Sequence, residues 1–308
     1  GNSFAPHIHF EYRDSKSVPL NPLTMAFELE DQIMPVAREL AVIPLSQNAL
    51  VNASPLTQTF PLFRDKSGVY HFPDTISVFG EFGFAMNVVD KREGTNNVYQ
   101  FHRAELMVDG NLEFELSYDR IPFNQGKFAK TMIEYDLKRK NLGEFQKLYR
   151  LPEHRKISIH SSDKSGILGL APGVHSVEMR IFDAHGNKTI IKGMVAATFP
   201  MTLEASEIFR DDKVVTLALS PKRGGLALRD AVVYSFTKYG FADKKVEIIH
   251  SEQVKKDLHI TLQLRFVKDR ILQVIGINQL GGMVDPFHWT DIKPEVSVVD
   301  IRPDLKIS

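Results

Sequence analysis

The chain has 308 residues, 43% of them hydrophobic and 25% charged, and contains no cysteine. This length predicts two or three domains with real cores, and the lack of cysteine excludes disulfides and thiolate chemistry. Lys+Arg and Asp+Glu both number 38, so the formal net charge is zero and no basic face for nucleic acid is expected.

The apolar residues form no run of about 18, so no transmembrane segment is expected in this chain. Phenylalanine and tyrosine number 21 and 8 against one tryptophan, which favours β-structure. The chain begins with Gly1 and shows no charged and apolar leader, so we expect any targeting signal to lie upstream.

The first segment alternates with a period of two, as in a strand. Residues 7–13 read HIHFEYR and place His7, His9, Glu11 and Arg13 on one face. Pro19 and Pro22 end this segment. Residues 24–40 then read as a connector with a helical opening that breaks at Pro35.

Residues 41–199 carry mostly strand and hairpin signals. Gly80 and Gly83 stand in an apolar run, as at a bulge or a close backbone approach. The pair Asp109-Gly110 between alternating segments predicts a hairpin. Helix formers without β-alternation predict a helical segment at about 129–150, and a turn at 184–187 separates two further strands.

The last part of the chain, residues 200–308, predicts a second sandwich. Five short apolar segments are separated by turn signals such as Gly224-Gly225 and Gly281-Gly282. The sequence ends in a strand-like run, so this domain is expected to be truncated.

The opening residues GNSFAPHIHFE, followed by PLNPL at 19–23, resemble the final motif of the LytM/lysostaphin-type zinc endopeptidases, which are peptidoglycan hydrolases. The match covers about the first 25 residues. Two of its positions depart from the family pattern, because Ala5 stands where glycine is usual and Phe4 where a small or polar residue is common.

The resemblance implies that His9 is a zinc ligand and His7 a catalytic histidine that orients or deprotonates the metal-bound water. Catalytic zinc needs three protein ligands and an open position. The family's other ligands come from an upstream His-x-x-x-Asp motif, and no histidine of this chain is followed by aspartate four residues later. The remaining zinc ligands are therefore expected upstream of Gly1, and this chain alone is expected to be inactive.

Other residues with possible functions have simpler interpretations. His71, His160 and His288 each precede an aspartate by three residues, which is typical of loops and turns. Residues 136–140 (DLKRK) read as a solvated helix face rather than a polymer contact. Trp289, beside Phe287 and His288, reads as a core or edge aromatic rather than a sugar platform.

The sequence thus predicts a mainly β protein. Residues 1–27 form the C-terminal end of a truncated zinc peptidase domain, 28–40 a connector, 41–199 an Ig-like β-sandwich with a short helical insertion, and 200–308 a second β-sandwich. Residues 41–198, in segments that begin with GEFGFAMNVVDKREG at Gly80, also resemble the β-rich region that follows the peptidase in large envelope-associated members from Bacteroidetes-type bacteria.

The function expected from the resemblance is peptidoglycan hydrolysis by the intact zinc peptidase, with a peptidoglycan peptide as substrate and envelope proteins as further partners. The β-sandwich domains are expected to serve as accessory domains for wall targeting or spacing. The location expected is the cell envelope, periplasmic or extracellular. Two alternatives stay open: a non-catalytic surface binding or adhesion protein with a degenerate peptidase remnant, and a carbohydrate-binding β-sandwich protein.

Overall fold

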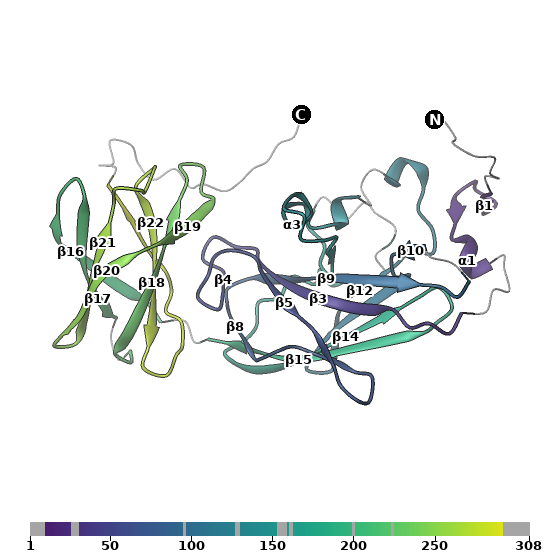
Figure 1. Ribbon diagram of the computed structural model, residues 1–308, viewed down its shortest axis with the longest axis horizontal. Helices are drawn as coiled ribbons and strands as arrows, with labels where there is room; N and C mark the ends of the chain where they lie inside the picture. Colours follow the sequence, from purple (N-terminus) through teal and green to yellow (C-terminus); the bar gives the residue numbers. More distant parts are fainter. Residues whose placement is uncertain are drawn as a thin grey trace.

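The computed structural model describes residues 10–25, 31–94, 97–126, 130–152, 159, 163–198, 201–222 and 225–291. Strands dominate the described residues, and the elements are grouped into two sandwiches that lie end to end (Figure 1). The prediction of a mainly β chain with two Ig-like sandwiches and a short helical insertion is confirmed. None of the described helices is long and apolar enough to cross a membrane.

A short antiparallel pair precedes the first sandwich. It joins β1 (Tyr12–Arg13) to β2 (Pro19–Leu20), and the four-residue helix α1 (Pro22–Met25) follows. The expected strand at 7–13 is therefore seen only at its C-terminal end, and its first three residues lie outside the described part of the chain.

One sheet of the first sandwich is antiparallel and centres on two long strands. Its order is β10 (Val98–Tyr99), β9 (Phe82–Lys91), β3 (Val36–Pro44) and β5 (Gln58–Pro61), with β13 (Gln146–Lys147) also pairing with β9. Strand β3 begins inside the range 28–40 assigned above to a connector, because residues 36–44 pair with β9 along their whole length.

The opposite sheet is built around the long hairpin of β14 (Gly173–Phe182) and β15 (Lys188–Ala197). Its order is β12 (Asn111–Ser117), β11 (Arg103–Val108), β14, β15, β7 (Tyr70–His71) and β6 (Phe63–Arg64). Strand β8 (Ile76–Phe79) runs parallel to β15 and pairs with β4 (Leu50–Val51).

Alternating burial explains how the two sheets form one core. Strand β11 alternates partly exposed and buried residues along its length, as expected for a strand with one face inward. Asp109 and Gly110 have φ of 49° and 79° and connect β11 to β12, so the predicted hairpin is confirmed with both central residues in the left-handed region that such turns require. Gly83 is needed for close approach, since a Cβ there would meet the Tyr149 ring at 2.5 Å.

The helical insertion is shorter than the predicted range of 129–150. It consists of the 3-10 turns η1 (Phe123–Gln125) and η2 (Lys130–Met132) and of α3 (Tyr135–Arg139). Asn141 and Gly143 have φ of 57° and 118°, which end the helix. The chain then enters β13 instead of continuing as helix.

The second sandwich packs two four-stranded antiparallel sheets around a separate core. The first has the order β16 (Leu203–Arg210), β17 (Val214–Pro221), β21 (Asp257–Gln263) and β20 (Ile248–Val254). The second has the order β19 (Ala242–Val246), β18 (Leu228–Phe236), β22 (Ile271–Asn278) and β23 (Phe287–Thr290).

An apolar contact joins the two sandwiches. Leu50 of β4 packs with Tyr234, Phe236, Ile275 and Met283 of the second sandwich. The backbone amide of Ala53 also donates to the Met283 sulfur at 2.9 Å. In Figure 1 the β4–β8 end of the first sandwich accordingly faces the sheet that contains β18 and β22.

Candidate functional site

The two histidines of the motif, His7 and His9, lie outside the described residues, as do Phe4 and Ala5. The structure therefore shows how the chain continues after the motif rather than the motif itself. Glu11, on the same predicted face as the histidines, forms an ion pair with Arg13 of β1. The Arg13 guanidinium in turn lies 5.0 Å from the centre of the Phe123 ring of the helical insertion.

The PLNPL stretch is fixed to the first sandwich through Asn21. Its backbone amide donates to the Asp119 carbonyl at 2.8 Å, and its side-chain Nδ2 lies 3.1 Å from His102 Nδ1 and 3.3 Å from the Tyr118 carbonyl. His102 Nε2 contacts Asp119 Oδ1 at 3.0 Å. A ring protonated at Nε2 satisfies both contacts, since it accepts from Asn21 and donates to Asp119.

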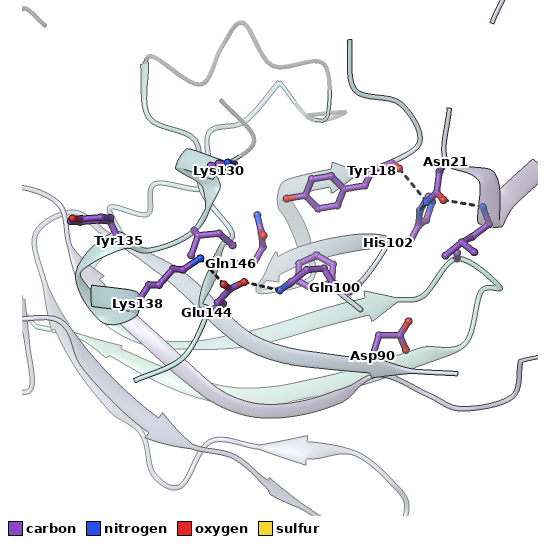
Figure 2. Close-up of a pocket in the computed structure, with 14 residues that line it drawn as sticks. Asn21, Asp90, Gln100, His102, Tyr118, Lys130, Tyr135, Lys138, Glu144 and Gln146 are labelled. Atoms are coloured by element: carbon purple, nitrogen blue, oxygen red, sulfur yellow. Dashed lines mark hydrogen bonds and ion pairs between the residues drawn. The ribbon is translucent and has the colours of Figure 1, made fainter. Parts of the chain in front are cut away.

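A cavity of about 650 Å³ opens beside this anchor. Its walls come from the N-terminal segment, from β9, and from the residues that follow β10 and β12. The helical insertion and β13 complete them. The lining residues are Asn21, Leu23, Asp90, Gln100, Phe101, His102, Tyr118, Lys130, Ile133, Tyr135, Lys138, Glu144, Gln146 and Ala184. Figure 2 shows Asn21 and His102 at one end of the cavity and Tyr135, Lys138 and Glu144 at the other.

The interior of the cavity is aromatic and its opening is charged. Phe101 is 2% exposed and forms part of the core, whereas Tyr135 is 69% exposed. Glu144 bridges the opening, because it pairs with Lys138 Nζ at 2.6 Å and accepts from Gln100 Nε2 at 3.3 Å. The site can therefore contact an apolar group deep inside and hydrogen-bond polar groups near its entrance.

Two polar side chains meet inside the cavity. Tyr118 and Gln146 point toward one another (Figure 2). Burial raises the pKa of the Tyr118 hydroxyl above its ordinary value, so the phenol stays protonated. Gln146 is 3% exposed, and its side-chain amide interacts with the Tyr118 hydroxyl, which opposes part of the rise in the Tyr118 pKa. Because an amide carries both donors and an acceptor, Gln146 can also hydrogen-bond a polar group of a ligand.

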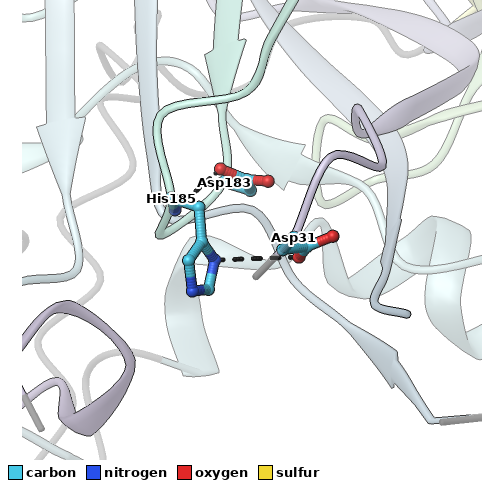
Figure 3. Close-up of side chains that lie close together, drawn as sticks. All are labelled: Asp31, Asp183 and His185. Atoms are coloured by element: carbon cyan, nitrogen blue, oxygen red, sulfur yellow. Dashed lines mark hydrogen bonds and ion pairs between the residues drawn. The ribbon is translucent and has the colours of Figure 1, made fainter. Parts of the chain in front are cut away.

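Close to one wall of the cavity lies a cluster formed by Asp31, Asp183 and His185. One ligand atom from each lies within 4.8 Å of the others. Figure 3 shows the His185 ring turned toward Asp31, with Nδ1 3.7 Å from Asp31 Oδ2. The predicted turn at 184–187 positions two of these residues, because Asp183 Oδ1 accepts from the amides of His185 and Asn187, both at 2.8 Å.

Asp90 of β9 adds a third carboxylate to this region. It is 5% exposed, and its Oδ1 has no hydrogen-bond partner within the described part of the chain. Burial, followed by the charges of Asp183 and Asp31, raises the pKa of Asp90 to about 7. The Arg92 guanidinium lies 3.5 Å from Asp31 Oδ2 and supplies the positive charge here.

Of the other residues considered in the sequence, His160 lies outside the described residues, while Trp289, His71 and the charged run at 136–140 can be placed. Trp289 is 6% exposed in the second core, and its Nε1 donates to Glu207 at 3.0 Å, so it is a core residue rather than a sugar platform. His71 pairs with Asp65 in a turn at 2.7 Å. Residues 136–138 form part of α3, whose Lys138 pairs with Glu144.

Sequence reasoning found neither the cavity nor the carboxylate cluster. The cavity joins segments more than 100 residues apart, and Asp31 and Asp90 carry no motif around them. The available signal is the turn at 184–187, whose residues predict turn chemistry alone. That interpretation is correct for the backbone of the turn but leaves out the role of His185 and the buried charge of Asp183.

No family model and no curated protein matches the chain. Among solved structures, the chain has 11% identity and a TM-score of 0.21 to the Bacteroides ovatus mixed-linkage glucan utilization locus SGBP-B, covering 79% of this chain and 48% of that one. Protocadherin Gamma B2 extracellular cadherin domains 1–5 give 9% identity and a TM-score of 0.20, over 76% and 40%.

A third structure, described as bearing on host cell surface retention of a 1.5-MDa bacterial ice-binding adhesin, gives 10% identity and a TM-score of 0.19, over 84% of this chain and 88% of that one. The chain thus spans less than half the length of the first two structures. At such low scores these likenesses carry no inference about what this chain binds.

Proposed function

We propose that this chain is the C-terminal part of an envelope-bound or secreted zinc peptidase of the LytM/lysostaphin type, and that its first sandwich binds a peptide of peptidoglycan beside the active site. The proposal rests on the sequence resemblance of residues 1–23. In the intact protein, His9 is a zinc ligand, His7 assists the attacking water, and the other ligands come from upstream of Gly1.

The observation that carries the role of the first sandwich is the anchoring of Asn21. The residue lies 12 positions after His9 in the sequence, and its backbone and side chain are both bound to the sandwich. The same residue lines the cavity. A substrate chain that leaves the peptidase active site would therefore meet this cavity within a short distance, and the sandwich would extend the substrate-binding surface.

The chemistry of the cavity can serve a peptide. A peptide supplies carbonyl groups for the buried Gln146 amide and for Lys130, as well as amide donors for Glu144. Apolar side chains of small residues can contact Phe101 and Ile133.

The first experiment concerns the peptidase itself. A version of the protein extended upstream by about 100–150 residues, one domain length, should bind one zinc ion in a site that uses His9 and should cleave peptidoglycan peptides. His9→Ala in the same protein should abolish cleavage and remove that ion. Retention of cleavage in the variant would refute the role of His9.

The second experiment tests the cavity in the 308-residue chain. Calorimetric titration with a peptidoglycan stem peptide should give a dissociation constant that rises about tenfold on Tyr135→Ala, since loss of an aromatic contact costs about 1.4 kcal/mol. The matched control is Tyr239→Ala, because Tyr239 is 70% exposed against 69% for Tyr135 but lies in the second sandwich. Equal binding by both variants would exclude Tyr135 from the site.

The rival function is a non-catalytic surface binding protein. The observation that favours it is that the described residues contain a formed cavity without needing the peptidase domain. If the extended protein has no zinc site that depends on His9 while stem-peptide binding persists, the histidines are a remnant and binding is the function of the chain.

A further inference from the structure

We propose that Asp31, Asp183 and His185 form a binding site for a divalent transition-metal ion, distinct from the zinc site expected at the N-terminal motif. The site would lie at the end of the first sandwich, where the β14–β15 turn meets the residues that precede β3. This inference does not depend on the proposed peptidase or peptide-binding function.

The spacing of the three residues is the first support. The three ligand atoms lie within 4.8 Å of one another, and two ligands that share a metal at about 2.1 Å are separated by roughly 3–4 Å. The 3.7 Å between His185 Nδ1 and Asp31 Oδ2 falls in this range. It is too long for a hydrogen bond, so the two groups face one another without being joined (Figure 3).

Burial without hydrogen bonding is the second support. The Asp31 side chain is 1% exposed, and its Oδ2 has no hydrogen bond among the described residues; it forms an ion pair of 3.5 Å with Arg92 and lies 3.7 Å from His185 Nδ1. Buried carboxylate oxygens ordinarily accept hydrogen bonds or bind a cation. This oxygen lies beside the imidazole that would share the ion with it.

Charge is the third support. Three acidic side chains, Asp31, Asp90 and Asp183, lie close together, and Arg92 is the cation paired with them among the described residues, so acidic groups outnumber cationic ones here. Asp90 comes from a different strand, and its Oδ1 is buried without a hydrogen-bond partner in the described structure. A divalent cation would balance this excess.

Asp183 retains capacity for a metal although it caps the turn. Its Oδ1 accepts two backbone amides, and its Oδ2 accepts from Asn187 Nδ2 at 2.7 Å. An ionised carboxylate has about four acceptor positions, so one remains. The imidazole makes the donor set mixed, which suits Zn²⁺ or Mn²⁺ better than Ca²⁺ or Mg²⁺.

The test uses the 308-residue chain with His7→Ala and His9→Ala, so that the N-terminal motif cannot bind metal. After removal of metal with EDTA, calorimetric titration with ZnCl₂ should give one site per chain. Saturation should also raise the Tm by about 5 °C or more. Cobalt(II) substitution should give visible absorption bands, which report the geometry of the bound ion.

Three further variants in the same background decide which residues bind. Asp31→Asn and His185→Gln should each weaken zinc binding at least tenfold. The matched control is His175→Gln, a histidine that is paired with Asp109 at 2.6 Å and with the Ala171 carbonyl at 2.7 Å; its substitution should leave zinc binding unchanged. Melting curves in EDTA show whether each variant folds.

Three outcomes would overturn the proposal. The first is no zinc binding by the folded parent, in which case Arg92 alone compensates the acids. The second is equal weakening by His185→Gln and His175→Gln. The third is tight Ca²⁺ binding that His185→Gln leaves unchanged, which would show an oxygen-only site without the imidazole.

Discussion

The two sandwiches contain turns with the same hydrogen bonds and different charges. In the first sandwich, Asp183 Oδ1 accepts from the amides two and four residues later, both at 2.8 Å. In the second, Asn278 Oδ1 accepts from the amides of Leu280 and Gly282, both at 2.9 Å. Both side chains are buried, at 2% and 8% exposure.

The two turns differ in the charge of the side chain that accepts the hydrogen bonds, and this difference shows which property the turn itself requires. A neutral amide oxygen is enough to hold such a turn, as Asn278 shows, so the turn does not require the negative charge of Asp183. Burying a charge costs free energy unless something compensates it. The carboxylate at 183 therefore points to a second role, and its neighbours His185 and Asp31 indicate what that role is.

The largest loss of stability is expected from a substitution at the contact between the sandwiches. The result shows whether the two sandwiches, and so their turns, unfold independently. Leu50→Ala removes a side chain that is 0% exposed and packs against Tyr234 and Phe236. We expect a loss of about 3 kcal/mol in the free energy of unfolding and, in calorimetry, two transitions in place of one. A single unshifted transition would show that the sandwiches are not coupled through Leu50.

A smaller effect is expected from the charge excess near the first turn. The pKa of Asp90 is raised to about 7 from 3.8, so between these values the folded protein holds a proton that the unfolded chain releases. Stability should therefore fall as pH rises from about 4 to 7 and stay low above it. Asp90→Asn removes this penalty.

In EDTA, the free energy of unfolding measured with urea should be about 2 kcal/mol larger for Asp90→Asn than for the parent at pH 8. At pH 3.5 the two values should be equal. Asn retains the oxygen that accepts from the Lys91 amide, so the variant changes charge more than shape. A gain that is the same at both pH values would mean that the charge of Asp90 has no part in the effect.

The sequence predicts the parts of this structure that depend on local pattern. Alternation and turn residues identify the β-rich class, the Asp109-Gly110 hairpin and the turn at 184–187, because these depend on neighbouring residues. The extent of the helical insertion could not be predicted, since residues 146–147 are held by pairing with distant β9 rather than by helix propensity. The cluster could not be predicted for the same reason, since its members come from positions 31, 183 and 185.

The smallest effect is expected from exchanging the two turn residues. Asp183→Asn keeps the oxygen that accepts both amides, loses the bond from Asn187 Nδ2 and relieves repulsion with Asp90 and Asp31. Asn278→Asp also keeps its oxygen, and the Arg229 side chain lies near this turn. In EDTA, each variant should unfold within about 1 kcal/mol of the parent, because the turn needs an acceptor and not a charge.

Zinc should then distinguish the two variants in the His7→Ala, His9→Ala background. It should raise the Tm of the parent and of Asn278→Asp equally, and it should leave the Tm of Asp183→Asn unchanged, because among the described residues an imidazole and a second carboxylate lie beside the turn of the first sandwich and not beside that of the second. If Asp183→Asn instead loses several kcal/mol in EDTA, the charge at 183 is required for folding. The two turns would then share their hydrogen bonds, but the charge of the side chain would contribute to stability in the first sandwich only.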